Sequence, residues 1–327
     1  MADIAIASFQ EFAPGLSGRK FLITGASGFI GSQLCRRLCE SGAEVHAISR
    51  TLRHGEKGMR WWQGDVADHG TVMNLFSAIK PEVIVHLAAC VTGRRDLEVV
   101  LATLRDNLVS TINLLTAAVT NGCGRIVVVG SLEEPDLDQG QPVPCSPYAA
   151  SKWSASAYGR MFYQLYGLPV VIARLFMTYG PAQQDVQKLI PYVTLSLLQG
   201  TPPKLTDGSR PVDWIYIADA VDGLLAVSQV PGIEGHTIDI GSGTLIPVRV
   251  VVQHLVELTG GRSQPLFGAL PDRPYERIRV ANIADARAKL GWEAVISLEE
   301  GLARTVAWYR KQLLTNTPRV EQKEELR

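Results

Sequence analysis

Short runs of β-branched residues alternate along the chain with longer segments in which apolar residues recur at helical spacing. The short runs predict strands over residues 20–24, 44–49, 82–88, 125–131 and 169–176. The longer segments predict helices over residues 29–40, 71–79, 97–120, 148–166 and 298–314. Such alternation is typical of a parallel sheet with helices on both faces. The expected fold is therefore α/β, a doubly wound parallel (Rossmann) sheet with a smaller C-terminal lobe.

Composition narrows the classes of partner. Basic and acidic residues number 32 each, so a net charge of zero gives no support for a nucleic-acid partner. No apolar run reaches the roughly 20 residues of a membrane span, and the opening "MADIAIASFQEFAPG" lacks the basic start of a signal peptide. The five cysteines show no zinc spacing, so we expect a reduced, cytoplasmic protein with no metal site.

A glycine-rich segment, "TGASGFIG", joins the first predicted strand to the first predicted helix. Gly25, Gly28 and Gly31 let the backbone turn sharply and approach a pyrophosphate, which the N–H groups at the helix start would bind. The alternative is a tight strand-to-helix turn without a ligand. We expect a dinucleotide here, bound by Gly25, Ser27, Gly28, Phe29, Ile30 and Gly31.

This spacing, with Thr24 before it, resembles the extended branch of the short-chain dehydrogenase/reductase family, and the resemblance runs through most of the chain. It implies that Asp65 and Val66 of "GDVAD" meet the adenine. It also implies that Ala88 and Ala89 of "VIVHLAA" pass under the nicotinamide ribose and that Asn107 of "DNLVSTINLL" belongs to the site. The two helices 97–120 and 148–166 form the dimer interface of similar proteins, so a homodimer is expected.

The regular alternation of predicted strands and helices ends near Phe176. The later segment "LPDRPYERIRVANIADARAKLGW" resembles the C-terminal lobe of nucleotide-sugar enzymes of this branch. We expect residues 1–176 plus 212–240 to form the dinucleotide-binding domain. Residues 177–211 plus 241–327 would form the substrate-binding lobe, and the polar tail "TNTPRVEQKEELR" a solvated, partly disordered end.

The second predicted strand ends in Ser49, followed by Arg50 and Arg53, where an acid often holds the adenosine ribose. A hydroxyl and guanidinium groups would instead bind a 2′-phosphate, because arginine–phosphate pairs are charge-assisted and often bidentate. The pattern favours NADP(H), with NAD(H) possible. The alternative is a solvated basic loop that also holds His54 and Lys57.

The segment "SPYAASKW" places Tyr148 and Lys152 four residues apart on one face of a predicted helix, with Ser146 as its N-cap. A tyrosine ordinarily has a pKa of about 10, and a fixed cation nearby is expected to lower it. Tyr148 would then be a general acid or base. By resemblance, Ser131 holds the substrate oxygen and Lys152 also binds the nicotinamide ribose. The alternative is a surface pair on a helix.

Two acids, Glu133 and Glu134, follow Ser131. They fit either a solvated acidic loop or a role on a sugar. Family members that dehydrate sugars carry Thr-Asp-Glu or Thr-Ser-Glu here, and the glutamate removes a proton. Glu133 is therefore a candidate catalytic residue, but Leu132 replaces the acid. The run "GSLEE" looks closer to reductases of 4-keto sugars.

Three anchors for the sugar nucleotide are expected from the resemblance, and two are altered. Met177 replaces an asparagine in "RLFMTYGP", and Val212 replaces an arginine that Arg210 could substitute. Arg273 in "DRPYE" matches the arginine that grips the diphosphate.

The favoured function is an NADP(H)-dependent oxidoreductase that reduces a keto group, a 4-keto group, on an activated nucleotide sugar. The alternatives within the enzyme class are an NAD(P)-dependent 4-epimerase and a 4,6-dehydratase. From a different class, an NADP(H)-sensing regulator with a dead active site remains, although such proteins usually lose the tyrosine or the lysine, and Tyr148 and Lys152 are both present.

Overall fold

The computed structural model describes residues 15–53, 58–135, 141–261, 263–273 and 275–316. The chain start, most of the polar tail, and His54 and Lys57 of the basic loop lie outside these residues. The chain divides into two compact units. The first comprises residues 1–178, 211–246 and 273–295, and the second comprises 179–210, 247–272 and 296–327. Residues 273–295, expected in the smaller lobe, thus cluster with the first unit.

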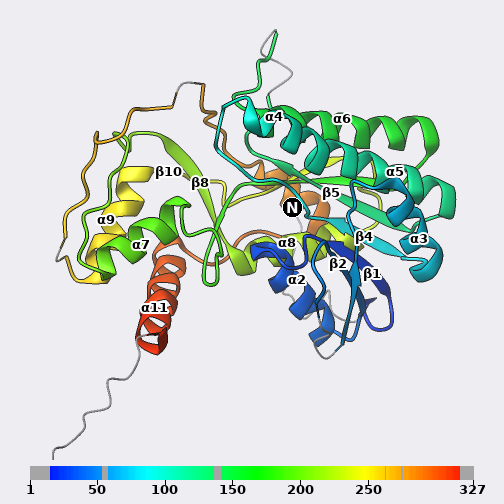
Figure 1. Cartoon of the computed structure of the whole chain (residues 1–327), viewed down its shortest axis with the longest axis horizontal. Helices are drawn as coiled ribbons and strands as arrows, with labels where there is room; N and C mark the ends of the chain where they lie inside the picture. The colour runs from blue at the N-terminus through cyan, green and yellow to red at the C-terminus, as the bar shows by residue number, and fades with distance from the viewer. Residues whose placement is uncertain (1–14, 54–57, 136–140, 262, 274, 317–327) are drawn as a thin grey trace, which may run out of the picture. The chain divides into compact units, whose positions relative to one another are not determined.

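The first unit is built on a seven-stranded sheet in the order β3-β2-β1-β4-β5-β6-β9 (Figure 1). All neighbouring strands run parallel, which is the doubly wound order with a seventh strand added. The strands are β1 (Lys20–Thr24), β2 (Glu44–Ser49), β3 (Met59–Gln63), β4 (Val83–His86), β5 (Arg125–Ser131), β6 (Val170–Leu175) and β9 (Thr237–Ile240). The predicted fold class is confirmed.

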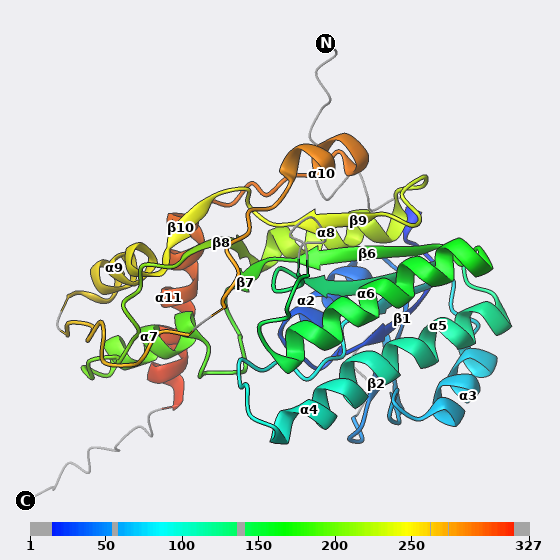
Figure 2. The same cartoon turned by 90° about the horizontal axis from the view of Figure 1, so that it is seen from above.

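Helices cover both faces of this sheet. Figures 1 and 2 show α3 (His69–Ile79), α5 (Ser110–Asn121) and α6 (Pro147–Tyr166) on one face, with α2 (Phe29–Glu40) and α8 (Ile217–Gln229) on the other. The predicted helix 97–120 is three segments in the structure. They are α4 (Glu98–Thr103), a π-helix η2 (Leu104–Val109) and α5.

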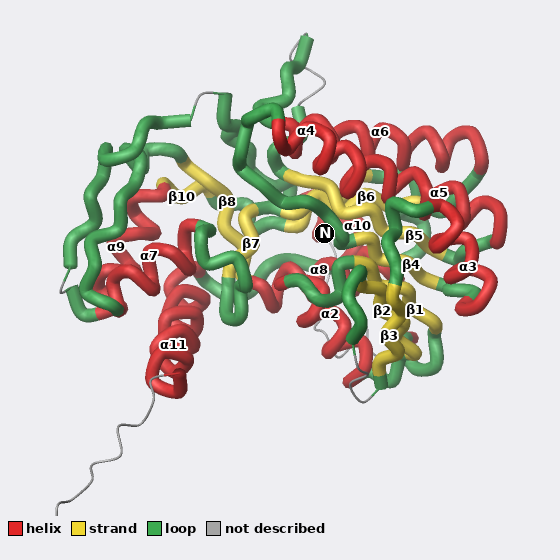
Figure 3. Tube along the Cα trace, viewed as in Figure 1, coloured by secondary structure: helices red, strands yellow, loops and turns green. Residues whose placement is uncertain are grey.

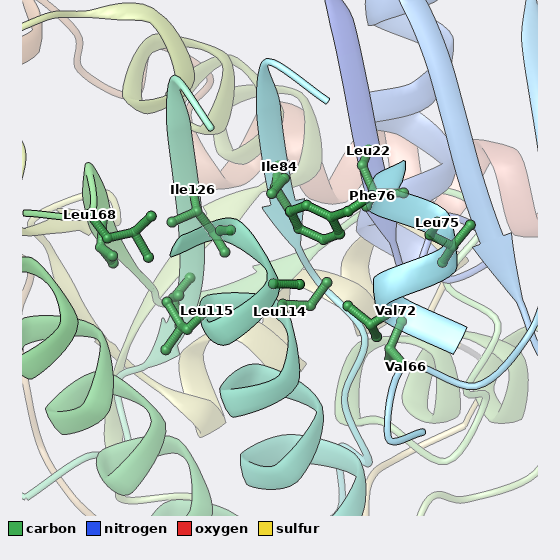
Figure 4. Packing of buried hydrophobic residues seen from close by; sticks show 14 of the residues in the cluster. Leu22, Val66, Val72, Leu75, Phe76, Ile84, Leu114, Leu115, Ile126 and Leu168 are labelled. Atoms are coloured by element: carbon green, nitrogen blue, oxygen red, sulfur yellow. The ribbon is translucent and has the colours of Figure 1, made fainter. Parts of the chain in front are cut away.

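The main core fills the space between the sheet and α3, α5 and α6 (Figure 4). Phe76 of α3 and Leu114 of α5 are fully buried against Leu22 and Ile84 of the central strands. The apolar positions that predicted these helices are the ones that pack here, so periodicity and packing agree.

The structure also has a separate three-stranded sheet, with the strand order β10-β8-β7. It consists of β10 (Leu245–Pro247), β8 (Pro211–Tyr216) and β7 (Met177–Tyr179). Helix α10 (Ile283–Leu290) packs beside β9 in the first unit. None of these four elements was predicted, because short strands and helices of one to two turns show little periodicity.

In the described part of the second unit, the helices are α7 (Leu189–Leu198), α9 (Val248–Thr259) and α11 (Leu298–Asn316), which are among those drawn in red in Figure 3. They pack against one another, and the Tyr309 hydroxyl donates to the carbonyl of Gln183 at 3.0 Å. The predicted helix 298–314 is confirmed as α11. Within the part of the chain described here, no helix has the length and hydropathy of a membrane span.

Candidate active site

The turn between β1 and α2 needs its glycines for close backbone packing. Gly25 has a positive φ of 68°, and a Cβ there would lie 2.6 Å from the Ala88 nitrogen. A Cβ on Gly31 would lie 2.2 Å from the Gly25 carbonyl oxygen. Helix α2 has Gly28 at its N-cap, so it starts without a side-chain cap, and its first turn holds no acid. Its start therefore suits a pyrophosphate, whose charge the helix dipole favours.

The ends of β1 and β4 are joined by a buried hydrogen-bonded chain. The Thr24 hydroxyl lies 2.7 Å from His86 Nδ1 and accepts from the Ala88 amide at 3.1 Å. His86 Nε2 lies 3.0 Å from the Thr111 hydroxyl of α5. Burial, with the charge of Lys152, lowers the pKa of His86 to about 3. His86 is therefore neutral, and this chain fixes the backbone at Ala88.

Ser49 and Arg50 lie at the tip of β2, at the edge of the sheet where the cofactor's adenosine end is expected. The Ser49 hydroxyl lies 3.2 Å from the Thr51 hydroxyl. Arg50 is exposed and reaches Asp106 of η2 at 3.3 Å. Arg53 instead lies over the Trp61 ring, 5.4 Å from its centre. Arg50 is thus the better placed of the two arginines for a phosphate at the strand tip.

Asp65 and Val66 follow β3. Asp65 accepts from the Ala67 amide at 2.9 Å and pairs with Arg105 of η2. Partial burial opposes the charge of Asp65, but these hydrogen bonds and the Arg105 charge prevail and hold its pKa below the usual value. The Val66 carbonyl accepts from Asn113 Nδ2 at 3.1 Å. Asp65 is therefore a charged acceptor beside the expected adenine position.

Asn107 lies inside the π-helix η2, where π-bulges are often found at functional sites. Its side chain is buried and accepts from the Cys90 amide at 2.6 Å. Its Nδ2 donates to the Ser151 hydroxyl of α6 at 2.8 Å. Asn107 therefore ties the loop after Ala88 and Ala89 to helix α6, one residue before Lys152.

Ser146 starts α6 as predicted, since its hydroxyl accepts from the Ala149 amide at 3.0 Å. The helix start places Tyr148 beside Ser131 at the end of β5, where the Ser131 hydroxyl favours the charged form of the phenol. The residue Tyr148 is only partly buried, but burial of its hydroxyl raises the pKa. The charges of Glu133 and Glu134 raise it further, and Ser131 opposes them. The prediction that Lys152 lowers the pKa of Tyr148 is therefore wrong, since the protein's own groups together raise this pKa.

Lys152 lies one helical turn after Tyr148 and is 5% exposed. Its Nζ donates to the Val129 carbonyl of β5 at 2.8 Å. Burial lowers the pKa of Lys152 to about 8, and the charge of Glu134 opposes this lowering. The ammonium group is therefore held near the end of β5, at the residue before Gly130 and two before Ser131.

The two acids after Ser131 have different surroundings. Glu133 is partly exposed, and its Oε2 accepts from the Ser146 hydroxyl at 3.4 Å. Glu134 is 1% exposed, and its Oε1 accepts from the Ser131 amide at 2.7 Å. The interpretation of both as a solvated acidic loop is wrong for Glu134. Leu132 between them and Ser131 is buried.

The expected substrate anchors lie in different parts of the chain. Met177 opens β7, and Val212 is buried in β8. Arg273 lies beside Gly93, where a Cβ would come 2.7 Å from its Nη1. Arg210 belongs to the second unit. No group of side chains in the described ranges has the composition of a metal site.

Two residues of this network were missed from the sequence, namely Arg105 and Ser151. Each has a side chain of an ordinary type, and only the fold places it at the strand ends. Glu134 offered one signal, since an acid directly after a buried strand can fold back onto the strand's last amides.

Residues 21–241 match the NAD dependent epimerase/dehydratase family. The chain is 30% identical to the dTDP-glucose 4,6-dehydratase of Haemophilus influenzae, over 88% of this chain and 97% of that protein. The crystal structure of UDP-glucose 4-epimerase from Thermotoga maritima with UDP-glucose is 26% identical, with a TM-score of 0.82 over 90% of this chain and 99% of that one.

The structure of MoeE5 with UDP-glucose and NAD is 30% identical, with a TM-score of 0.80 over 90% of this chain and 99% of that one. These matches confirm the resemblance to the extended short-chain dehydrogenases/reductases. The chain belongs to the NAD dependent epimerase/dehydratase family.

Proposed function

We propose that this protein is a nucleotide-sugar 4-epimerase that retains NAD(H) through its reaction. The observation that carries the proposal is the placement of Ser131 and Tyr148 side by side at the end of β5, with Lys152 one helical turn further on and a buried leucine directly after Ser131. An epimerase needs only an acid–base group, a hydrogen-bond donor for the sugar oxygen and the cofactor. The UDP-glucose 4-epimerase and MoeE5 structures, with UDP-glucose bound, support the same substrate class.

The chain's own residues would move one proton in each direction. Ser131 would donate to the sugar C4 oxygen, and Tyr148 would take the C4 hydroxyl proton and later return it. When bound, oxidised nicotinamide supplies the hydride acceptor and a positive charge. Because the chain itself raises the pKa of Tyr148, this added charge would be needed to bring the phenol into a working range.

A 4,6-dehydratase is less well supported, although relatives of that activity match the chain. Dehydration needs an acid for the departing hydroxyl, and by family resemblance this acid precedes the glutamate at Glu133. Leu132 stands there, buried at 6% exposure, and it has no proton to give. This departure separates the chain from the dehydratase pattern.

A second candidate is the NADP(H)-dependent reduction of a 4-keto sugar. It is favoured by Ser49 and Arg50 at the strand tip, where no acid stands. The exposed pair between Arg50 and Asp106 is 3.3 Å long, and such pairs contribute little, about 0–1 kcal/mol. A phosphate could therefore displace Asp106 from Arg50.

The deciding experiment incubates the purified protein with UDP- and dTDP-hexoses, with their 4-keto derivatives, and with NAD or NADPH. Products are followed by NMR, and reduced cofactor by absorbance at 340 nm. A C4 epimer formed without net cofactor change supports the epimerase. Stoichiometric NADPH consumption with a 4-keto sugar supports the reductase. Loss of water to a 4-keto-6-deoxy sugar would refute both.

Cofactor preference is tested with Arg50→Asp. If Arg50 binds a 2′-phosphate, the variant should weaken NADPH binding about 10–100-fold relative to NADH, the usual worth of a charged hydrogen bond. The matched control is Arg53→Asp, an identical charge change at an arginine that lies over Trp61. If the two variants weaken NADPH binding equally, Arg50 contributes only general positive charge and does not bind the 2′-phosphate.

A further inference from the structure

Glu134 is the most deeply buried acid at the edge of the sheet that carries the candidate site. It is 1% exposed, and carboxylates are almost never buried to this extent unless they are paired. Its Oε1 accepts from the Ser131 amide at 2.7 Å and from the Ser156 hydroxyl at 3.1 Å. Its own amide donates to the Ser131 carbonyl at 3.1 Å. Glu134 thus closes a short loop onto both backbone groups of Ser131.

The residue before Ser131 makes room for this carboxylate. A Cβ on Gly130 would lie 2.5 Å from Glu134 Oε1, closer than two such atoms can approach. The Gly130 side of the strand end is therefore filled by a charged oxygen in place of a side chain. Gly130, Ser131 and Glu134 form one unit, in which the glycine accommodates the acid that holds the serine.

Burial raises the pKa of Glu134, and the charges of nearby cations oppose that rise. Lys152 and Arg160 come from α6, Arg174 from β6, and Arg279 from the segment before α10; each interacts electrostatically with Glu134. Arg174 also pairs with Asp239 at 3.1 Å. The other ionisable groups facing this cluster are Glu133 and Tyr148.

Lys152 is the cation of this group that belongs to the candidate active site. Its Nζ is held by the Val129 carbonyl, and Ser156, which donates to Glu134, lies one turn further along the same helix face. The two ends of the network, Lys152 and Ser131, therefore meet at Glu134.

We propose that Glu134 is a positioning residue, which fixes Ser131 at the end of β5 and supplies the negative charge that faces the Lys152 ammonium group, one helical turn after Tyr148. The role extends the proposed function, on which its activity measurement rests. It is separate from any part that Glu133 plays, because Glu133 faces Ser146 and Cys145.

The proposal predicts a shift of the pH profile in a definite direction. The charge of Glu134 raises the pKa of Lys152, which is about 8, and also raises the pKa of Tyr148. Without that charge, both groups lose their protons at lower pH. The acid limb of the profile, where Tyr148 must accept a proton, and the alkaline limb, where Lys152 must keep one, should both move toward acid.

The test is Glu134→Gln, which keeps the shape of the side chain and removes the charge. We expect kcat to fall about 10²-fold, as for a small misplacement of a reacting group, and both limbs to move to lower pH. Independently of substrate, the Lys152 signal in ¹³C-lysine NMR, assigned by its loss in Lys152→Met, should titrate below the wild-type value of about 8. Glu134→Asp keeps the charge, so its limbs should stay near the wild-type positions while kcat falls.

The matched control is Glu234→Gln, which removes the carboxylate beside buried Arg125 at the opposite end of β5. It should lower the free energy of unfolding and leave both limbs unmoved. Unmoved limbs and an unmoved Lys152 titration in Glu134→Gln would overturn the proposal. If that variant does not fold, Gly130→Ala, which displaces the carboxylate, must lower the Lys152 pKa, and no change there would also overturn it. If the wild-type protein is inactive on nucleotide sugars, the proposed function is refuted, but the role of Glu134 is still tested by the Lys152 titration.

Discussion

Strand β5 has a buried charged residue near each end, and the two clusters are built differently. At the start of the strand, Arg125 donates through Nη1 to the carbonyls of Val227 at 2.7 Å and Val230 at 3.0 Å. Its other Nη pairs with Glu234. The partners are two backbone carbonyls and one acid, so the cluster joins β5 to the end of α8 and the segment after it.

At the other end of β5, the buried acid Glu134 lies near two groups that can gain or lose a proton, Lys152 and Tyr148. Glu134 holds Ser131 and Ser156, and its charge acts on Lys152 and Tyr148. Ligands bind at the carboxyl ends of strands in sheets of this kind. The comparison indicates that buried charge has a different function at each end of one strand. It stabilises the fold at the start of β5 and adjusts acid–base groups at its end.

The largest effect that separates the two ends is expected from Tyr148→Phe. The loss of the hydroxyl should lower kcat by roughly 10²–10⁴-fold, the usual contribution of general acid–base catalysis. The free energy of unfolding should change by only about 1 kcal/mol, since the variant loses no more than one polar contact, with the Ser131 hydroxyl. Steady-state kinetics measure kcat, and urea unfolding measures the free energy of unfolding. A stability loss as large as the loss in catalysis would make Tyr148 a structural residue.

The reverse result is expected from Arg125→Met at the start of the strand. The change leaves buried carbonyls and Glu234 without their cation, and losing one partner of a buried pair costs about 3–5 kcal/mol. Because Glu234 is partly exposed, we expect the lower end of that range in urea unfolding, with kcat unchanged in the folded enzyme. A fall in kcat would show that the two ends of β5 are coupled.

Arg94→Met is the control for this change. Arg94 is an exposed arginine that pairs with Asp96 and Glu98 at 2.8 Å each. Exposed pairs contribute little to stability, so this variant should unfold close to the wild type. Burial, and not the number of ion pairs, would then account for the difference between the two arginines.

Much of this architecture could be predicted from local pattern. The strand "RIVVVGS" is centred on four β-branched residues and predicts β5 to the residue, and Ser146–Pro147 marks the start of α6. The catalytic candidates follow because Tyr148 and Lys152 have helical spacing and Ser131 ends a strand. Edge strand β3 was missed, because "MRWWQ" is only partly buried and its Trp62 bonds His46 of β2 at 3.0 Å.

The charge state of the site could not be predicted from spacing. Tyr148 and Lys152 share a helix face, yet the Lys152 ammonium points to the Val129 carbonyl, and burial decides the pKa of Tyr148. The break of the predicted helix 97–120 at η2 was also missed, since a π-turn shifts the register without changing the composition. Such features depend on contacts between distant segments, which periodicity does not contain.

The smallest of the three effects is a pH dependence of stability at the carboxyl end of β4. His86 has a pKa of about 3 when folded, against 6.5 normally. The unfolded chain therefore binds one more proton below pH 6.5, and the free energy of unfolding falls as pH decreases from 6.5 toward 3. The slope approaches about 1.4 kcal/mol per pH unit. His86→Gln should lose this contribution, measured by urea unfolding at pH 7.5, 6.5 and 5.5.

The difference between wild type and His86→Gln isolates this slope, because another group acts in the opposite direction. Burial raises the pKa of Asp222 to about 6, so the folded state takes up a proton there as pH falls, and this offsets part of the His86 loss in both proteins. Wild type should therefore lose more stability than the variant between pH 6.5 and 5.5. Equal losses would mean that His86 is protonated in the folded enzyme, and the Thr24–His86–Thr111 chain would then carry a charge at the edge of the candidate site.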